Sequence, residues 1–193
     1  MTPGETFILR AALDGQKSIY RDIEIEPSKS LYRLAEAIVN AFDFDFDHAF
    51  GFYSGLTPAK LTRVDPRYEL FADMGEAGPA VFSVKKTKVS QAFPAIGHTL
   101  VFLFDYGDDW RFRVSLKETG TKRPKVRYPR VVTIRGNAPP QYPDHDEDID
   151  DGGERYGVNP PTGEVIRFGK RRRHLEQLLR PFKSKRSPDE RTS

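Results

Sequence analysis

The chain has 193 residues, of which 37% are hydrophobic and 31% charged, and its formal net charge is +3. This length is typical of one domain and also allows two small ones, and the composition indicates a packed core. The absence of cysteine excludes a disulfide framework, a thiolate nucleophile and a cysteine-based zinc site. Because no apolar stretch is long enough to span a membrane and residues 1–10 lack a signal-peptide pattern, we expect a cytoplasmic protein with no membrane contact.

Two strands are predicted at the start of the chain, at Phe7–Leu13 and Ser18–Ile25, joined by a turn at Asp14-Gly15. The second strand alternates apolar and polar residues, which is typical of an antiparallel strand with one buried face. A helix capped by Ser28 or Ser30 is predicted next, because apolar residues recur at helical spacing. These residues are Leu31, Leu34, Ala35, Ile38 and Phe42.

Short elements and one long loop are predicted in the middle of the chain. A third strand at Ala49–Tyr53 completes a ββαβ opening, which is typical of compact α+β folds. Gly55–Gly78 is rich in proline, glycine and charge and is predicted to be a loop. A short strand at Val81–Val84 and one helical turn at Val89–Phe93 follow.

The clearest hairpin consists of His98–Asp105 and Trp110–Glu118. Both faces of its first strand are apolar, so we expect that strand to lie in the centre of a sheet. Tyr128–Arg135 is a further strand, and Asn137–Pro161 is predicted to be loop. The fold class predicted is α+β, a single domain with a mainly antiparallel sheet and a packed amphipathic helix.

Charge is segregated near the end of the chain. Asp144–Glu154 contains seven acids and no Lys or Arg, whereas residues 170–193 contain nine bases against three acids. A basic amphipathic helix is predicted at Arg171–Phe182, and the residues beyond Lys183 are predicted to be disordered. The predicted division is therefore an α+β domain over residues 1–169, with an acidic loop, and a basic helix and tail over residues 170–193.

The segment Phe104–Trp110 combines three carboxylates, a tyrosine and the single tryptophan of the chain. It has two interpretations: an acidic and aromatic ligand site, or a tight turn in which Asp108 and Asp109 accept backbone N–H groups while Trp110 enters the core. The second is favoured by chemistry alone, and it predicts a largely buried indole. Similarly, His48 beside Asp47 is either a general base oriented by a carboxylate or, more often for a lone histidine, a hydrogen-bonded structural residue.

Several stretches resemble the plasmid pRiA4b ORF-3-like family, which is also described as insertion-element passenger proteins. Tyr106–Trp110 resembles its Tyr-Asp-Phe-Gly-Asp-Asp-Trp signature, and Ile19–Ile23 resembles its Ile-Trp-Arg-Arg-Ile strand. Asp45–His48 resembles its Asp-x-Asp-His-x-His-x-Phe segment, and Ala138–Pro140 with Asp151–Gly153 resembles its Pro-Pro-Glu-Asp-x-Gly-Gly stretch. The resemblance implies a shared fold over most of residues 7–156 and a plasmid or mobile-element context.

The chain departs from that family pattern at three points. Phe50 and Phe112 stand where the pattern has histidine, and Gln141-Tyr142 stands where it has Glu-Asp. If those histidines and acids form a metal or catalytic site in relatives, most of that site is missing here. We therefore expect no cofactor and no metal, and we also expect no specific calcium site in the acidic loop, where Asp151 takes the place of the required glycine.

The leading hypothesis is a non-enzymatic binding module that engages a protein or a nucleic acid. The alternative is a hydrolytic or metal-assisted enzyme that uses Asp47, His48, Asp108 and Asp109. The candidate ligand or partner surface comprises Asp47, His48, Asp105, Asp108, Asp109 and Trp110.

A second candidate surface is the basic end of the chain. Exposed cations neutralise phosphates, so we expect weak, sequence-independent nucleic-acid binding there, reduced by pairing with the acidic loop. The cations concerned are Lys170, Arg171, Arg172, Arg173, Arg180, Lys183, Lys185 and Arg186.

Overall fold

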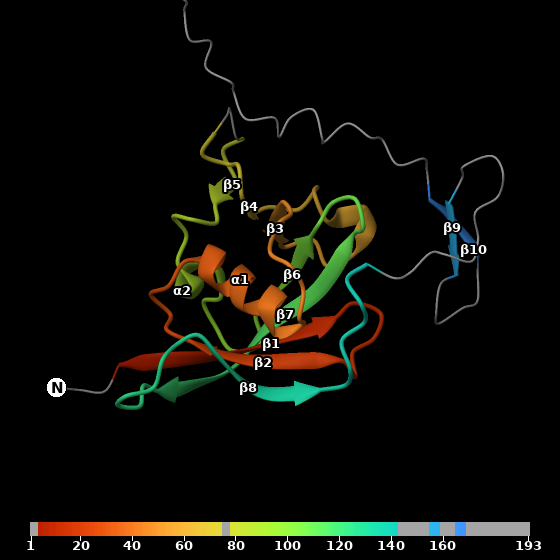
Figure 1. Cartoon of the computed structure of the whole chain (residues 1–193). Coiled ribbons are helices and arrows are strands. Elements are labelled where there is room, and N and C mark those ends of the chain that lie inside the picture. Colours follow the sequence, from red (N-terminus) through yellow and green to blue (C-terminus); the bar gives the residue numbers. More distant parts are fainter. Residues whose placement is uncertain (1–3, 75–77, 143–154, 159–164, 169–193) are drawn as a thin grey trace, which may run out of the picture. The chain divides into compact units, whose positions relative to one another are not determined.

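The computed structural model describes residues 4–74, 78–142, 155–158 and 165–168. By its contacts the chain divides into two units, residues 1–142 and 143–193. The first unit contains an eight-stranded sheet of order β5-β4-β3-β6-β7-β1-β2-β8, in which β4 and β5 are parallel and all other neighbours antiparallel (Figure 1). Its strands are β1 (Glu5–Leu13), β2 (Tyr20–Ile25), β3 (Phe50–Tyr53), β4 (Arg67–Glu69), β5 (Val81–Ser83), β6 (Thr99–Phe104), β7 (Trp110–Thr121) and β8 (Arg130–Arg135).

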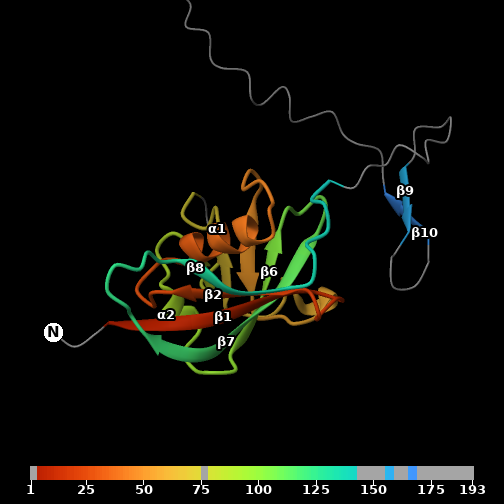
Figure 2. The same ribbon diagram turned by 60° about the horizontal axis from the view of Figure 1, so that its bottom comes forward.

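Helix α1 (Leu31–Ala41) follows β2, and the short helix α2 (Val89–Ala92) precedes β6, so the α+β class and the ββαβ opening are confirmed. Ser30 is the N-cap of α1, and its side chain accepts from the Arg33 N–H. The apolar stripe of α1 is fully buried, and Figure 2 shows the helix lying across one face of the sheet. No helix among the described residues is long and apolar enough to cross a membrane.

Strand β6 is central, as its two apolar faces predict, because it lies between β3 and β7. Phe102 and Phe104 are on the face that packs in the main core with α1. Val101 and Leu103 are on the opposite face, in a smaller cluster with Tyr53 and Leu61. Leu61 follows a 3-10 turn, η1 (Pro58–Lys60), which covers that part of the sheet.

The prediction that β2 has only one buried face is wrong. Its polar residues are buried as well, because β2 lies between β1 and β8 and ion pairs cover its second face. Arg10 Nε lies 2.8 Å from Asp22 Oδ1, and Arg130 Nε donates to Glu24 Oε2 over 2.8 Å. The Thr6 hydroxyl donates to the same glutamate over 2.8 Å. The two buried carboxylates of β2 are therefore each compensated by a cation.

Arg21 connects the helix to the edge of the sheet. Its side chain is buried, with Nε donating to the Ala41 carbonyl at the end of α1 over 2.8 Å and Nη1 donating to the Arg135 carbonyl of β8 over 2.9 Å. The guanidinium lies 4.6 Å from the centre of the Phe42 ring. Burial lowers the pKa of Arg21. These contacts fix the position of β8 relative to α1.

Two stretches predicted to be loops contain strands. Within Gly55–Gly78 the chain forms η1 and β4, because β4 pairs with β3 on one side and β5 on the other. Within Asn137–Pro161 it forms β9 (Arg155–Val158), which pairs with β10 (Val165–Phe168) in the second unit. The acidic loop, the boundary predicted after residue 169, the predicted helix at Arg171–Phe182 and the tail lie outside the described residues.

Candidate functional site

The pairing of β3 with β6 brings two of the predicted site segments together. Phe50 at the start of β3 is opposite Phe104 at the end of β6, and the Asp105 N–H donates to the Ala49 carbonyl over 3.0 Å. His48 immediately precedes this pair. The residues before β3 and after β6 therefore meet at one end of the sheet, as the interpretation of these residues as one surface requires.

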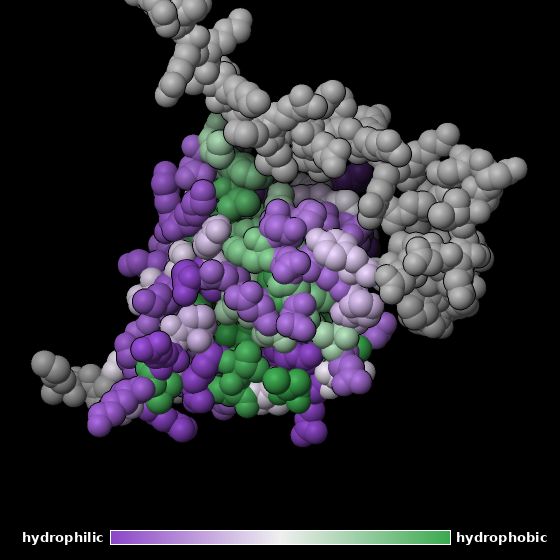
Figure 3. Space-filling model, in the orientation of Figure 1, coloured by the Kyte–Doolittle hydropathy of each residue, from purple (hydrophilic) through white to green (hydrophobic). Residues whose placement is uncertain are grey.

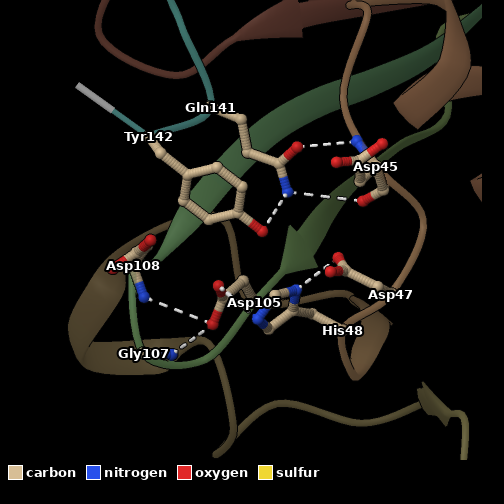
Figure 4. A network of polar contacts seen from close by, with 8 residues as sticks. All are labelled: Asp45, Asp47, His48, Asp105, Gly107, Asp108, Gln141 and Tyr142. Atoms are coloured by element: carbon tan, nitrogen blue, oxygen red, sulfur yellow. Dashed lines mark hydrogen bonds and ion pairs between the residues drawn. The ribbon is translucent and has the colours of Figure 1, made fainter. Parts of the chain in front are cut away.

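His48 lies between two carboxylates (Figure 4). Its Nδ1 is 2.6 Å from Asp47 Oδ1, and its Nε2 is 3.3 Å from Asp105 Oδ2. A general base needs a ring nitrogen that is free to face the substrate. Because both nitrogens of His48 face protein carboxylates, the geometry is that of a clamp between two segments of backbone.

Asp105 organises the turn between β6 and β7. It is 8% exposed and has a φ of 54°, in the left-handed region that aspartate tolerates better than most residues. Its Oδ1 accepts from the Gly107 N–H over 2.8 Å and from the Asp108 N–H over 3.4 Å, and its carbonyl accepts from the Asp109 N–H over 2.7 Å. The turn is therefore held by the Asp105 carboxylate, whereas the structural interpretation of the sequence assigned this role to Asp108 and Asp109.

Asp109 and Trp110 make their contacts with residues outside this cluster. Asp109 Oδ2 is 2.6 Å from Arg111 Nη2. The Trp110 ring packs on Phe44 at 4.8 Å between ring centres. The indole is partly rather than largely buried, because Trp110 is the first residue of β7, next to an exposed turn. Its Nε1 is nevertheless buried and has no hydrogen-bond partner among the described residues.

Gln141 and Tyr142 complete the site and were not predicted as part of it. Gln141 is 8% exposed, and its side chain bonds the backbone of Asp45 at both ends, accepting from the N–H over 2.6 Å and donating to the carbonyl over 3.3 Å. It also donates to the Tyr142 hydroxyl over 3.1 Å. The signal in the sequence was the glutamine directly after Pro139-Pro140.

The electrostatic character of this site is negative. Partial burial raises the pKa of Tyr142, and the nearby carboxylates raise it further. Those carboxylates are Asp47, Asp105, Asp45 and Asp108. Among the residues that the structure describes, no three His, Asp or Glu side chains form a group that could hold a metal ion. Such a surface repels anionic ligands.

A positively charged region lies on another part of the first unit, and it was also not predicted from the sequence. Residues 122–135 contain six cations and no acid. Lys122 pairs with Glu26, and Arg130 pairs with Glu24. The other four are exposed and form no ion pair within the described part of the chain; they are Arg123, Lys125, Arg127 and Arg135. A count of charge along the chain would have found this run.

Apolar side chains are exposed on β8 next to these cations. Val131 is 38%, Val132 36% and Ile134 64% exposed. Figure 3 shows hydrophobic side chains gathered in the lower part of the view, where Figure 1 draws β8. We call the three apolar residues and the four exposed cations, Arg123, Lys125, Arg127 and Arg135, the β8 surface.

A comparison with protein families shows to which family this chain belongs. The model of the plasmid pRiA4b ORF-3-like protein family matches residues 5–147. The chain belongs to this family. In the positions where the family pattern noted above has histidine, Phe50 and Phe112 are 1% and 0% exposed and pack in the core. Among the residues that the structure describes, His48 is therefore the one histidine of the cluster.

One solved structure supports the fold. A protein of unknown function from Methanosarcina mazei Go1 is similar, with a TM-score of 0.56 and 22% identity, and the match covers 69% of this chain and 71% of that chain. At this identity the likeness concerns the fold alone. No match was found among the curated proteins.

Proposed function

We propose that this chain is a non-enzymatic binding module that engages an acidic protein or a nucleic acid through the β8 surface. The observation that carries the proposal is the exposure of four cations that form no ion pair with the described residues, beside three exposed apolar residues on the outermost strand of the sheet. Exposed cations attract anionic molecules from solution. Exposed apolar side chains beside them add favourable contact to the binding free energy.

The contacts of His48 favour the hypothesis of a binding module over that of an enzyme. The enzyme would use Asp47, His48, Asp108 and Asp109 together, but Asp109 pairs with Arg111, and both nitrogens of His48 face carboxylates. A hydrolytic base needs one of those nitrogens for water or substrate. Purified protein that retains one equivalent of a divalent metal, lost in His48→Ala, would support the enzyme instead.

Family membership provides the biological setting of the proposal. The family takes its name from a plasmid open reading frame, so we place the partner among the proteins or nucleic acids that act with plasmids or other mobile elements. The chemistry of the β8 surface selects an anionic molecule as the partner.

The test compares two charge-reversed variants of the full chain. Arg127→Glu with Arg135→Glu alters the β8 surface, and Lys85→Glu with Lys86→Glu makes the same change in charge at exposed residues elsewhere. Fluorescence anisotropy with a glutamate-rich peptide and with single-stranded DNA measures binding at two salt concentrations. We expect the first variant to weaken binding of at least one probe well beyond the control, and binding to fall with salt. Equal losses in both variants, or no binding at all, contradict the proposal.

A further inference from the structure

We infer that the β8 surface receives an extended acidic peptide of a partner protein, which pairs with the outer edge of β8 as a ninth strand. The inference rests on the proposed function and names the class of partner and its geometry. Among the described residues, β8 pairs with β2 on one side and with no strand on the other. Its outer backbone N–H and C=O groups are therefore available to another chain.

The length of β8 is sufficient for such pairing. Its six residues, Arg130–Arg135, extend over about 20 Å at the usual rise of a strand. It is held in place on its inner side by the β2 ladder and by Arg21, which donates to the Arg135 carbonyl. A partner strand thus meets an edge that is already ordered, which reduces the entropy lost on binding.

Both faces of β8 offer apolar contacts to an added strand. Opposite β2, Val131 pairs with Ile23 and Ile134 with Arg21, while the register shift leaves Val132 unpaired between them. On the side of α1, a groove of about 380 Å³ is lined by Ile23, Ala37 and Val131 among others. On the other side, a hollow of about 400 Å³ includes Val132 in its lining. Side chains of an added strand, which alternate between faces, enter both hollows.

The charges around β8 select an acidic partner. Arg127 precedes the strand and Arg135 ends it, so an added strand has near each end a cation that no described carboxylate pairs with. Many natural edge strands carry charge that prevents self-association, and cations of one sign repel a second copy of β8. The same cations attract glutamate and aspartate. This complementarity favours a peptide with acidic residues over a second copy of this chain.

A peptide fits this edge better than a nucleic acid does. The edge presents alternating N–H donors and C=O acceptors, and a peptide backbone matches both. Phosphates accept hydrogen bonds but do not donate them, so the carbonyls of β8 would face phosphate oxygens. The exposed Val131, Val132 and Ile134 also gain contact from aliphatic side chains.

The first experiment uses a labelled ten-residue peptide of alternating glutamate and valine and the same peptide with every amide N-methylated. The methylated peptide keeps the charges and side chains but loses the hydrogen-bond donors on both edges. We expect the full chain to bind the first peptide at least tenfold more tightly, and hydrogen exchange to slow at the amides of residues 131–135. Equal binding of the two peptides overturns strand addition.

The second experiment uses two matched apolar positions. Ile134 on β8 and Ile96 outside the strands are each 64% exposed, so Ile134→Thr and Ile96→Thr remove the same exposed side chain while keeping a β-branched residue. We expect Ile134→Thr to weaken binding of the glutamate–valine peptide about tenfold, the effect of losing roughly two buried methylene groups. Ile96→Thr leaves it unchanged. Equal effects of the two variants also overturn the inference.

The outcomes separate the inference from the proposed function. If single-stranded DNA binds through Arg127 and Arg135 while the glutamate–valine peptide does not bind, the binding function stands and the peptide partner is wrong. If both peptides bind equally and Arg127→Glu with Arg135→Glu weakens them, the binding function again stands without strand addition. If neither the peptides nor DNA bind, both statements fail.

Discussion

His48 Nε2 and Asp105 Oδ2 lie 3.3 Å apart across the end of the β3–β6 pair. His48 also contacts Asp47, and Asp105 also accepts from two N–H groups of the following turn. The two residues therefore join the segment before β3 to the turn after β6. Because their polar atoms are occupied by contacts within the protein, we expect substitutions of these residues to change the stability of the fold.

Asp105→Asn and Asp105→Ala should differ in stability. Asparagine keeps an oxygen that accepts from the Gly107 N–H and tolerates a φ of 54°, whereas alanine does neither. We expect Asp105→Ala to lower the free energy of unfolding by about 1–3 kcal/mol and Asp105→Asn by clearly less. Urea denaturation measures both. Equal losses would show that the turn does not depend on the side-chain oxygen.

Trp110→Phe should cost much less than Trp110→Ala. Phenylalanine keeps the contact with Phe44 and removes a buried Nε1–H that has no partner among the described residues. We expect a loss of about 1 kcal/mol or less for Trp110→Phe, and about 3 kcal/mol for Trp110→Ala, where most of the packed ring is lost. Chemical denaturation followed by circular dichroism measures the two values. A Trp110→Phe variant as unstable as Trp110→Ala would contradict this account of the indole.

Tyr53 should make the protein less stable at high pH. Its side chain is 1% exposed and its hydroxyl is 2.6 Å from that of Tyr106; burial first, and then this hydrogen bond, raise the pKa of Tyr53. The unfolded chain releases this proton near pH 10, whereas the folded chain retains it, so the free energy of unfolding falls as pH rises above about 10. The slope attributable to one proton is at most about 1.4 kcal/mol per pH unit.

Tyr53→Phe isolates that effect. We expect the variant to be less stable at neutral pH, where it lacks the hydrogen bond, but to lose less stability than the wild type between pH 10 and 11. Urea unfolding at several pH values, with tyrosinate absorbance near 295 nm as a second readout, checks the prediction. Identical slopes in the two proteins would show that Tyr53 ionises in the folded state.

Nucleic-acid binding by the basic end of the chain stays a prediction, because its cations lie outside the described residues. We expect these cations to bind single-stranded DNA weakly, with a dissociation constant of the order of 10⁻⁴–10⁻⁶ M near physiological salt, and removal of residues 170–193 to abolish this contribution. Replacing Asp146, Asp148 and Asp150 by asparagine should strengthen it, since fewer carboxylates then compete for the cations. Anisotropy over a salt series measures both effects. Binding that survives the truncation would direct attention to the β8 surface.

Local patterns in the sequence were sufficient to predict many of the helices, strands and turns. The spacing of apolar residues predicted α1, and the two apolar faces of His98–Asp105 predicted a central strand. Asp14-Gly15 and the Asp105–Asp109 turn were predicted from residues with known backbone preferences. These features depend on neighbours within a few residues, so a single sequence contains their signal.

The tertiary structure alone decided which distant residues meet. No local pattern shows that Gln141 bonds the backbone of Asp45, or that Arg21 connects α1 to β8. The strand pattern at Tyr128–Arg135 was visible in the sequence, but its place at the edge of the sheet was not. An edge strand and a central strand differ in what lies beside them, and that depends on long-range pairing. For this reason the sequence predicted a strand at β8, and only the structure showed that the strand is the outermost one of the described sheet.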